Sequence, residues 1–119
     1  LQELWTRIVF NIMIANTDDH LRNHGFLMTN KGWILSPAYD LNPDENGTGL
    51  SLNISLTDNS LDPELALEVI EFFRMDRDIG HRIIERLKES VSSWRRVADR
   101  YKLPRSEQER MAKVLDRFI

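Results

Sequence analysis

The organisation of this chain can be worked out from Asn16-Thr17-Asp18-Asp19-His20-Leu21-Arg22-Asn23, followed after a short interval by Ser36-Pro37-Ala38-Tyr39-Asp40-Leu41. Asp18 and Asn23 are five positions apart, and residues at that spacing point in different directions on an α-helix. Short polar side chains also favour local turns, because they hydrogen-bond to nearby backbone groups. The segment therefore predicts an irregular loop in which Asp18 and Asn23 can face one centre.

The flanking segments predict how this loop is held. Residues 2–15 carry apolar side chains at helical spacing, which predicts a buried helix leading into the loop. Two short apolar runs at 25–28 and 32–35 surround a turn, which predicts a β-hairpin. A hairpin reverses the chain, so we expect it to bring Asp40 back beside Asn23.

The remainder of the sequence predicts mostly helix. Each predicted helix has a recognisable start signal. Polar turn formers at 42–49 predict a mobile loop, and weak alternation at 50–54 indicates a short strand. The predicted fold class is mainly α with a small β-hairpin. The predicted helices are 63–73 after Asp62-Pro63, with Phe72 among its apolar residues, and 77–101 after Asp76, with Tyr101 on its apolar face and Gly80 weakening its first turn slightly. A last helix is predicted after Pro104-Arg105, with a capping box of Ser106 and Glu109.

Composition narrows the classes of function. The 119 residues are 41% hydrophobic and 29% charged, as in an ordinary soluble domain. The absence of cysteine excludes disulfides, thiol catalysis and zinc–thiolate sites. No apolar run approaches the ~20 residues that a membrane helix needs, and no signal peptide opens the sequence. We therefore expect a cytoplasmic protein with no membrane partner.

Charge is distributed unevenly. Residues 1–73 carry three basic against eleven acidic side chains, whereas residues 74–119 carry thirteen basic against eight acidic ones. The acidic part coincides with the polar loop. The basic part could contact nucleic acid, although such a bias more often reflects solvated helix faces.

Asp18, Asn23 and Asp40 match the order of groups in a phosphoryl-transfer site. In that chemistry an aspartate accepts the proton of the attacking hydroxyl. An asparagine five residues later and an aspartate beyond a hairpin hold the magnesium ions that bridge the nucleotide phosphates. The alternative is that Asp and Asn are simply common in surface loops.

The loop resembles the catalytic loop of HipA-like kinases, whose pattern is Asp, any residue, His, two residues, Asn, with a later Tyr-Asp pair. Asn-His-Gly-Phe-Leu, Gly32-Trp33-Ile34-Leu35 and Ser-Pro-Ala-Tyr-Asp-Leu-Asn-Pro extend the resemblance over residues 8 to 43. Asp19 and Arg22 depart from the usual small residue and lysine. Asp19 is either a third acid near the metal or an exposed loop charge, and we expect the exposed charge. Arginine keeps the charge but replaces a point charge with a planar fork.

This resemblance implies the helical C-terminal lobe of a kinase-like fold over residues 1–119, with a catalytic and metal loop at 16–43 and a helical subdomain at 62–119. It implies an ATP- and Mg²⁺-dependent serine/threonine kinase. Catalysis would use Asp18, with His20 and Arg22 near the γ-phosphate, and Asn23 and Asp40 would bind the metal and nucleotide.

The resemblance also implies a set of partners. The parent would be the toxin of a bacterial toxin–antitoxin pair of the kind linked to persistence. Its protein substrate would be a translation factor such as an aminoacyl-tRNA synthetase. A HipB-like DNA-binding antitoxin would restrain it, so contact with DNA would be indirect.

The chain lacks the nucleotide-clamping parts of a kinase. Its five glycines form no phosphate-binding cluster, and no lysine lies on a strand suited to the α and β phosphates. We therefore expect the sequence to be a fragment that needs an N-terminal ATP lobe and does not transfer phosphate alone.

Two other classes of function stay open. One is a metal-dependent phosphohydrolase that uses Asp18, Asp19, His20 and His24, although no His or Asp pair lies at metal-ligand spacing on a helix. The other is a non-enzymatic helical module whose basic face binds nucleic acid or protein. That binding would depend on Arg95, Arg96 and Arg100. His20 itself either supports the phosphate site or is a histidine bonded to backbone.

Overall fold

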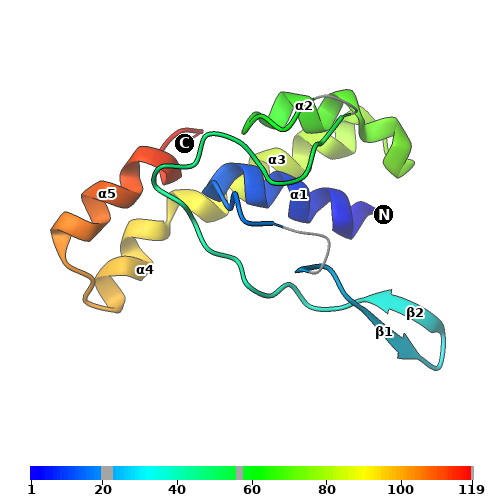
Figure 1. Cartoon of the computed structure of the whole chain (residues 1–119), viewed down its shortest axis with the longest axis horizontal. Helices are drawn as coiled ribbons and strands as arrows, with labels where there is room; N and C mark the ends of the chain where they lie inside the picture. The colour runs from blue at the N-terminus through cyan, green and yellow to red at the C-terminus, as the bar shows by residue number, and fades with distance from the viewer. Residues whose placement is uncertain (20–22, 56–57, 119) are drawn as a thin grey trace.

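The computed structural model describes residues 1–19, 23–55 and 58–118. The chain is mainly helical with one two-stranded antiparallel sheet, as the sequence predicts (Figure 1). Its extents are 44 × 32 × 25 Å. The elements are α1 (Gln2–Ile14), β1 (Phe26–Thr29), β2 (Gly32–Leu35), α2 (Pro63–Glu68), η2 (Ile70–Phe73), α3 (Arg77–Ser92), α4 (Trp94–Arg100) and α5 (Arg105–Leu115).

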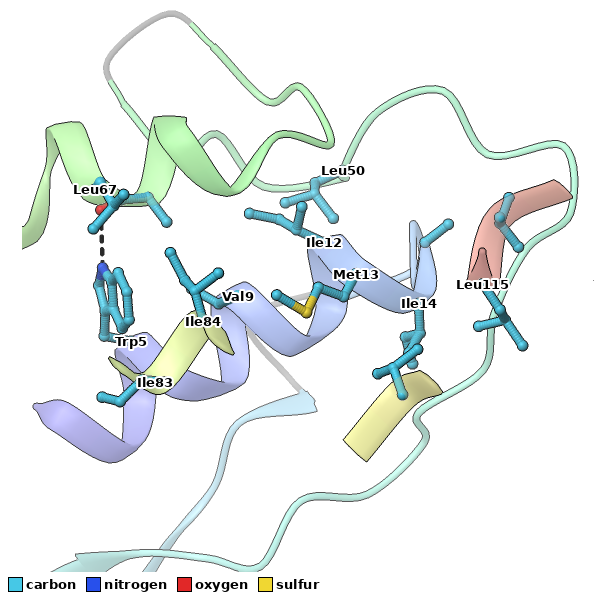
Figure 2. Close-up of a cluster of buried hydrophobic side chains, with 14 of the residues drawn as sticks. Trp5, Val9, Ile12, Met13, Ile14, Leu50, Leu67, Ile83, Ile84 and Leu115 are labelled. Carbon is cyan, nitrogen blue, oxygen red and sulfur yellow. Dashed lines mark hydrogen bonds between the residues drawn. The ribbon is translucent and has the colours of Figure 1, made fainter. Parts of the chain in front are cut away.

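Helix α1 is the centre of the hydrophobic core and packs against α2, α3 and α5 (Figures 1 and 2). Trp5 is fully buried, and its indole Nε1–H donates to the carbonyl oxygen of Ala66 at 2.9 Å. Each fully buried large apolar side chain contributes about 1.5–3 kcal/mol to folding. The helix that carries the loop is therefore also the most firmly anchored element, as its apolar periodicity predicts. The same core contains Val9, Ile12 and Met13 of α1 together with Leu67, Ile83 and Ile84 of α2 and α3.

Helix α2 begins at the predicted cap. Asp62 accepts a hydrogen bond from the backbone N–H of Glu64 at 3.0 Å, and Pro63 occupies the first helical position. The predicted helix over 63–73 does not continue as one α-helix, because it changes to the 3₁₀-helix η2 at Ile70. Phe72, expected to be buried, is 82% exposed as a result.

The predicted helix over 77–101 is divided at Ser93. Helix α3 ends there and α4 begins at Trp94. Tyr101, predicted on the buried face, lies beyond the end of α4 and is 72% exposed. The last helix begins at Arg105 without the predicted capping box, since no side-chain cap bond forms at its start.

The β-hairpin projects from the helical body (Figure 1). Phe26 pairs with Leu35 and Met28 with Trp33, so these four side chains share one face of the hairpin. Leu27 and Ile34 pair on the other face. Most of these side chains are exposed, Trp33 at 67% and Phe26 at 63%. Both faces are apolar, which is unusual for a two-stranded hairpin in water.

Between β2 and α2, residues 36–55 and 58–62 form no helix or strand and run along the helical body (Figure 1). The predicted strand at 50–54 is not formed; a single antiparallel bridge joins Gly49 and Ser60 instead. Glu45, in the loop predicted to be mobile, accepts two hydrogen bonds from Arg110 of α5, at 2.7 and 2.8 Å. This part of the loop is therefore tethered to the helices.

Among the described residues, none of the helices combines the length and the apolar character that crossing a membrane requires.

Candidate functional site

The polar loop begins at a sharp end to α1. Ala15 has a φ of 55°, in the left-handed region that usually ends helices at glycine. The backbone N–H of Asn16 donates to the carbonyl oxygen of Asn11 at 2.9 Å, which closes the last turn. The chain therefore leaves the helix axis immediately before the candidate site.

Two buried asparagines stabilise this exit. The side-chain Nδ2 of Asn16 donates to Oδ1 of Asn11 at 3.0 Å, and neither residue is more than 1% exposed. This bond replaces part of what the two amides lose to water, whereas Nδ2 of Asn11 and Oδ1 of Asn16 have no hydrogen-bond partner among the described residues. Sequence reasoning missed this pair, because an asparagine within an apolar helix gives no signal of its partner.

The segment after Asp40 is joined to the start of the loop. Asp44 donates its backbone N–H to Ala15 and accepts from the Thr17 hydroxyl at 3.1 Å. Ser51 donates both its N–H and its hydroxyl to the carbonyl oxygen of Thr17. Segments about thirty residues apart in sequence thus hold one another in place beside Asp18.

The first acidic residues of the loop have different surroundings. Asp18 is exposed. Asp19, expected to be an exposed charge, is instead buried, and its Oδ1 lies 2.8 Å from Nε2 of His24. The sequence carried no signal for this pair other than the presence of both residue types. The two predicted catalytic residues His20 and Arg22 lie outside the described residues.

Asn23 and Asp40 lie side by side, as the hairpin predicts. Nδ2 of Asn23 donates to Oδ2 of Asp40 at 3.2 Å, across seventeen residues of sequence. Nδ2 of Asn42 donates to the other carboxylate oxygen at 2.9 Å. Asp40 has a φ of 59°, which is uncommon for a residue with a side chain. Tyr39, which precedes Asp40, is 46% exposed.

The base of the hairpin is fixed to α1, which explains how two distant residues meet. Ser36 donates its backbone N–H to Gly25 at 2.8 Å, closing the hairpin between Asn23 and Asp40. The guanidinium of Arg7, in α1, donates to the carbonyl oxygen of Ser36. A Cβ on Gly25 would lie 3.2 Å from the Ser36 hydroxyl, so the strands approach closely here.

The donor set around Asp40 fits magnesium. Mg²⁺ prefers oxygen ligands and is commonly held by one or two carboxylates together with substrate phosphates and water. Asp40 supplies carboxylate oxygens, and a rotation of the Asn23 amide presents its oxygen in place of its nitrogen. Within the part of the chain that the structure describes, no three His, Asp or Glu side chains gather as a metal site. This finding does not test the phosphohydrolase alternative, because His20, one of its four residues, lies outside the described residues.

Comparison with known proteins identifies the family. The family model described as HipA-like C-terminal domain matches residues 1–118. This chain belongs to the HipA-like C-terminal domain family. No curated protein and no solved structure matches the chain.

The match confirms the resemblance and the fold class that the sequence predicts for this HipA-like domain. Its mainly helical structure with one small hairpin is that of the helical C-terminal lobe. The division into a loop at 16–43 and a helical subdomain at 62–119 stays a prediction.

The three arginines of the nucleic-acid alternative differ in their surroundings: Arg96 and Arg100 are exposed, whereas Arg95 is paired within the HipA-like domain. Arg95, one of the three arginines on which that alternative depends, donates to Oδ2 of Asp116 at 2.6 Å and lies over the Trp94 ring. The Trp94 indole donates to the same carboxylate at 2.8 Å. The indole bond, then the arginine, lowers the pKa of Asp116, which keeps the carboxylate charged.

Proposed function

We propose that this HipA-like domain is the C-terminal lobe of an ATP- and Mg²⁺-dependent protein serine/threonine kinase. The observation that carries the proposal is the contact between Asn23 and Asp40, formed by closure of the hairpin. Protein kinases use a catalytic aspartate followed by a metal-binding asparagine, with a further metal-binding aspartate; here the exposed Asp18 precedes Asn23 by five residues.

Each residue has a distinct role in this proposal. Asp18 orients the substrate hydroxyl and accepts its proton. Asn23 and Asp40 hold magnesium, which when bound neutralises charge on the nucleotide phosphates. His20 and Arg22, whose roles rest on the family resemblance, act near the γ-phosphate.

The exposed hairpin supports a second lobe as the partner. Phe26, Met28 and Trp33 leave an apolar face uncovered beside the site. Apolar patches of this kind usually mark an interface. We propose that an ATP-binding lobe, on the same or another chain, covers this hairpin and supplies the glycine-rich loop and lysine that these residues lack.

The wider role follows from the family. We propose a cytoplasmic toxin that phosphorylates a translation factor such as an aminoacyl-tRNA synthetase and is held inactive by a DNA-binding antitoxin. These assignments rest on the family match alone.

Phosphate transfer from labelled ATP tests the proposal. The domain joined to its ATP lobe should label serine- or threonine-containing peptides, and Asp18→Ala should reduce the rate by about 10²–10⁴-fold, the usual contribution of a general base. Asp78→Ala is a matched control, because Asp78 is an exposed aspartate on α3. Equal rates for Asp18→Ala and the wild type would refute the assignment.

Metal binding provides an independent measurement. Water-proton relaxation with Mn²⁺, a paramagnetic substitute for Mg²⁺, should show weaker binding to Asn23→Ala and Asp40→Ala. Asn30→Ala, in the hairpin turn, should bind as the wild type does. Unchanged Mn²⁺ affinity in both site variants would contradict the metal-binding roles.

A further inference from the structure

The buried contact between Asp19 and His24 is not explained by the proposed chemistry. Nε2–H of His24 donates to Oδ1 of Asp19 at 2.8 Å, and their side chains are only 15% and 7% exposed. A carboxylate is costly to bury, so such a pair persists where its hydrogen bond is well formed. The bond joins the two ends of the polar loop. If the five-residue segment between them were fully extended, these ends would lie about 17 Å apart.

The position of this pair connects it to both candidate residues. Asp19 follows Asp18, and His24 follows Asn23, so each partner is one peptide unit from a proposed functional side chain. Consecutive Cα atoms are about 3.8 Å apart, so fixing His24 restricts where the Asn23 amide can lie.

The base of the β-hairpin also restricts the position of Asn23. Gly25, which follows His24, accepts the backbone N–H of Ser36, and the Asn23 amide donates to Asp40. Asn23 therefore lies between two anchors, the hairpin base and the buried pair.

We propose that Asp19 and His24 are positioning residues that close the loop and hold Asn23 in place for metal binding; this inference rests on the proposed function. The bond acts through the peptide between Asn23 and His24. For this role, the side chain at position 19 needs an oxygen atom that accepts the hydrogen bond from His24, and a full negative charge matters less.

Mn²⁺ titration of the 119-residue chain tests this, with Mn²⁺-induced broadening of the Asn23 side-chain amide in ¹H–¹⁵N spectra as a second readout. Asp19→Ala should weaken Mn²⁺ binding about tenfold, as loss of a group that supports a metal ligand commonly does, and should reduce the broadening. Asp19→Asn keeps an oxygen acceptor for His24 and should stay within about threefold of the wild type.

A stability control separates positioning from general loosening. Val114→Ala removes methyl groups from the core of α5 and should lower stability while leaving Mn²⁺ affinity unchanged. Wild-type Mn²⁺ affinity in Asp19→Ala, or equal losses in Asp19→Asn and Asp19→Ala, would overturn the positioning role. If Asn23→Ala and Asp40→Ala also bind Mn²⁺ normally, the proposed function fails as well, so the two failures are distinguishable.

Discussion

The positive φ of Asp40 predicts that Asp40→Gly and Asp40→Ala differ in stability. For a residue with a Cβ, a left-handed conformation costs about 1–2 kcal/mol, whereas glycine adopts it freely. Asp40 has a φ of 59° while both its carboxylate oxygens accept amide hydrogen bonds. Strain of this kind is often retained at functional sites, where the side chain is needed.

Asp40→Ala and Asp40→Gly lose the same two hydrogen bonds, so the difference between them isolates the backbone conformation. Alanine keeps the strained φ, and glycine removes the strain. Glycine loses more backbone freedom on folding, which offsets about 0.4–1 kcal/mol of that gain. We therefore expect Asp40→Gly to be more stable than Asp40→Ala by about 1 kcal/mol, or roughly 4 °C in Tm.

Urea unfolding followed by circular dichroism measures this difference. At Asp78, in the first turn of α3, the order should be reversed, because glycine in a helix is about 1 kcal/mol less stable than alanine. Both Asp40 variants should lose Mn²⁺ binding equally. If Asp40→Ala is as stable as Asp40→Gly or more so, the argument from strain is wrong.

Two further predictions concern the helical body. Gly80→Ala should destabilise the fold by about 1–2 kcal/mol in urea unfolding, because overpacking costs about 1–3 kcal/mol and outweighs the gain in helix propensity. The added Cβ would lie 2.4 Å from Ile70 Cδ1 and 3.2 Å from the Trp5 ring; a Gly80→Ala variant as stable as the wild type would contradict this close packing. The hydrogen bond from the Trp94 indole lowers the pKa of Asp116 in the folded protein. The charged carboxylate therefore stabilises the fold at pH values above the unfolded pKa of about 3.9, and this stabilisation is lost as the pH falls through the lower folded pKa. Asp116→Asn should therefore cost at most about 1 kcal/mol at pH 6, and this difference from the wild type should shrink towards pH 2; a difference independent of pH would refute it.

Local patterns predicted the elements that depend on neighbouring residues. The apolar periodicity of residues 2–15 corresponds to α1, and the Asp62-Pro63 signal marks the start of α2. The break at Ser93 was not predicted, because the apolar repeat continues across it; α4, which follows the break, packs against both α3 and α5. Gly80 was read as a weak point in a helix, whereas it is where α3 approaches Trp5 most closely.

In the candidate site too, some features could be read from the sequence and one could not. The order and spacing of Asp18, Asn23 and Asp40, and the hairpin between the last two, can be read from the sequence because turn formers and strand formers act locally. The burial of Asp19 against His24 could not be read, since both residue types are common in exposed loops.

The sequence by itself determined the family, the central helix and the reversal of chain direction that brings Asp40 to Asn23, because these depend on residue type and short-range spacing. Only the tertiary structure decided which polar groups are paired: Asn11 with Asn16 and Asp19 with His24 in the interior, and Glu45 with Arg110 at the surface. The physical reason is that a polar side chain accepts burial only when a partner replaces water, and that partner is supplied by the way the chain folds back on itself.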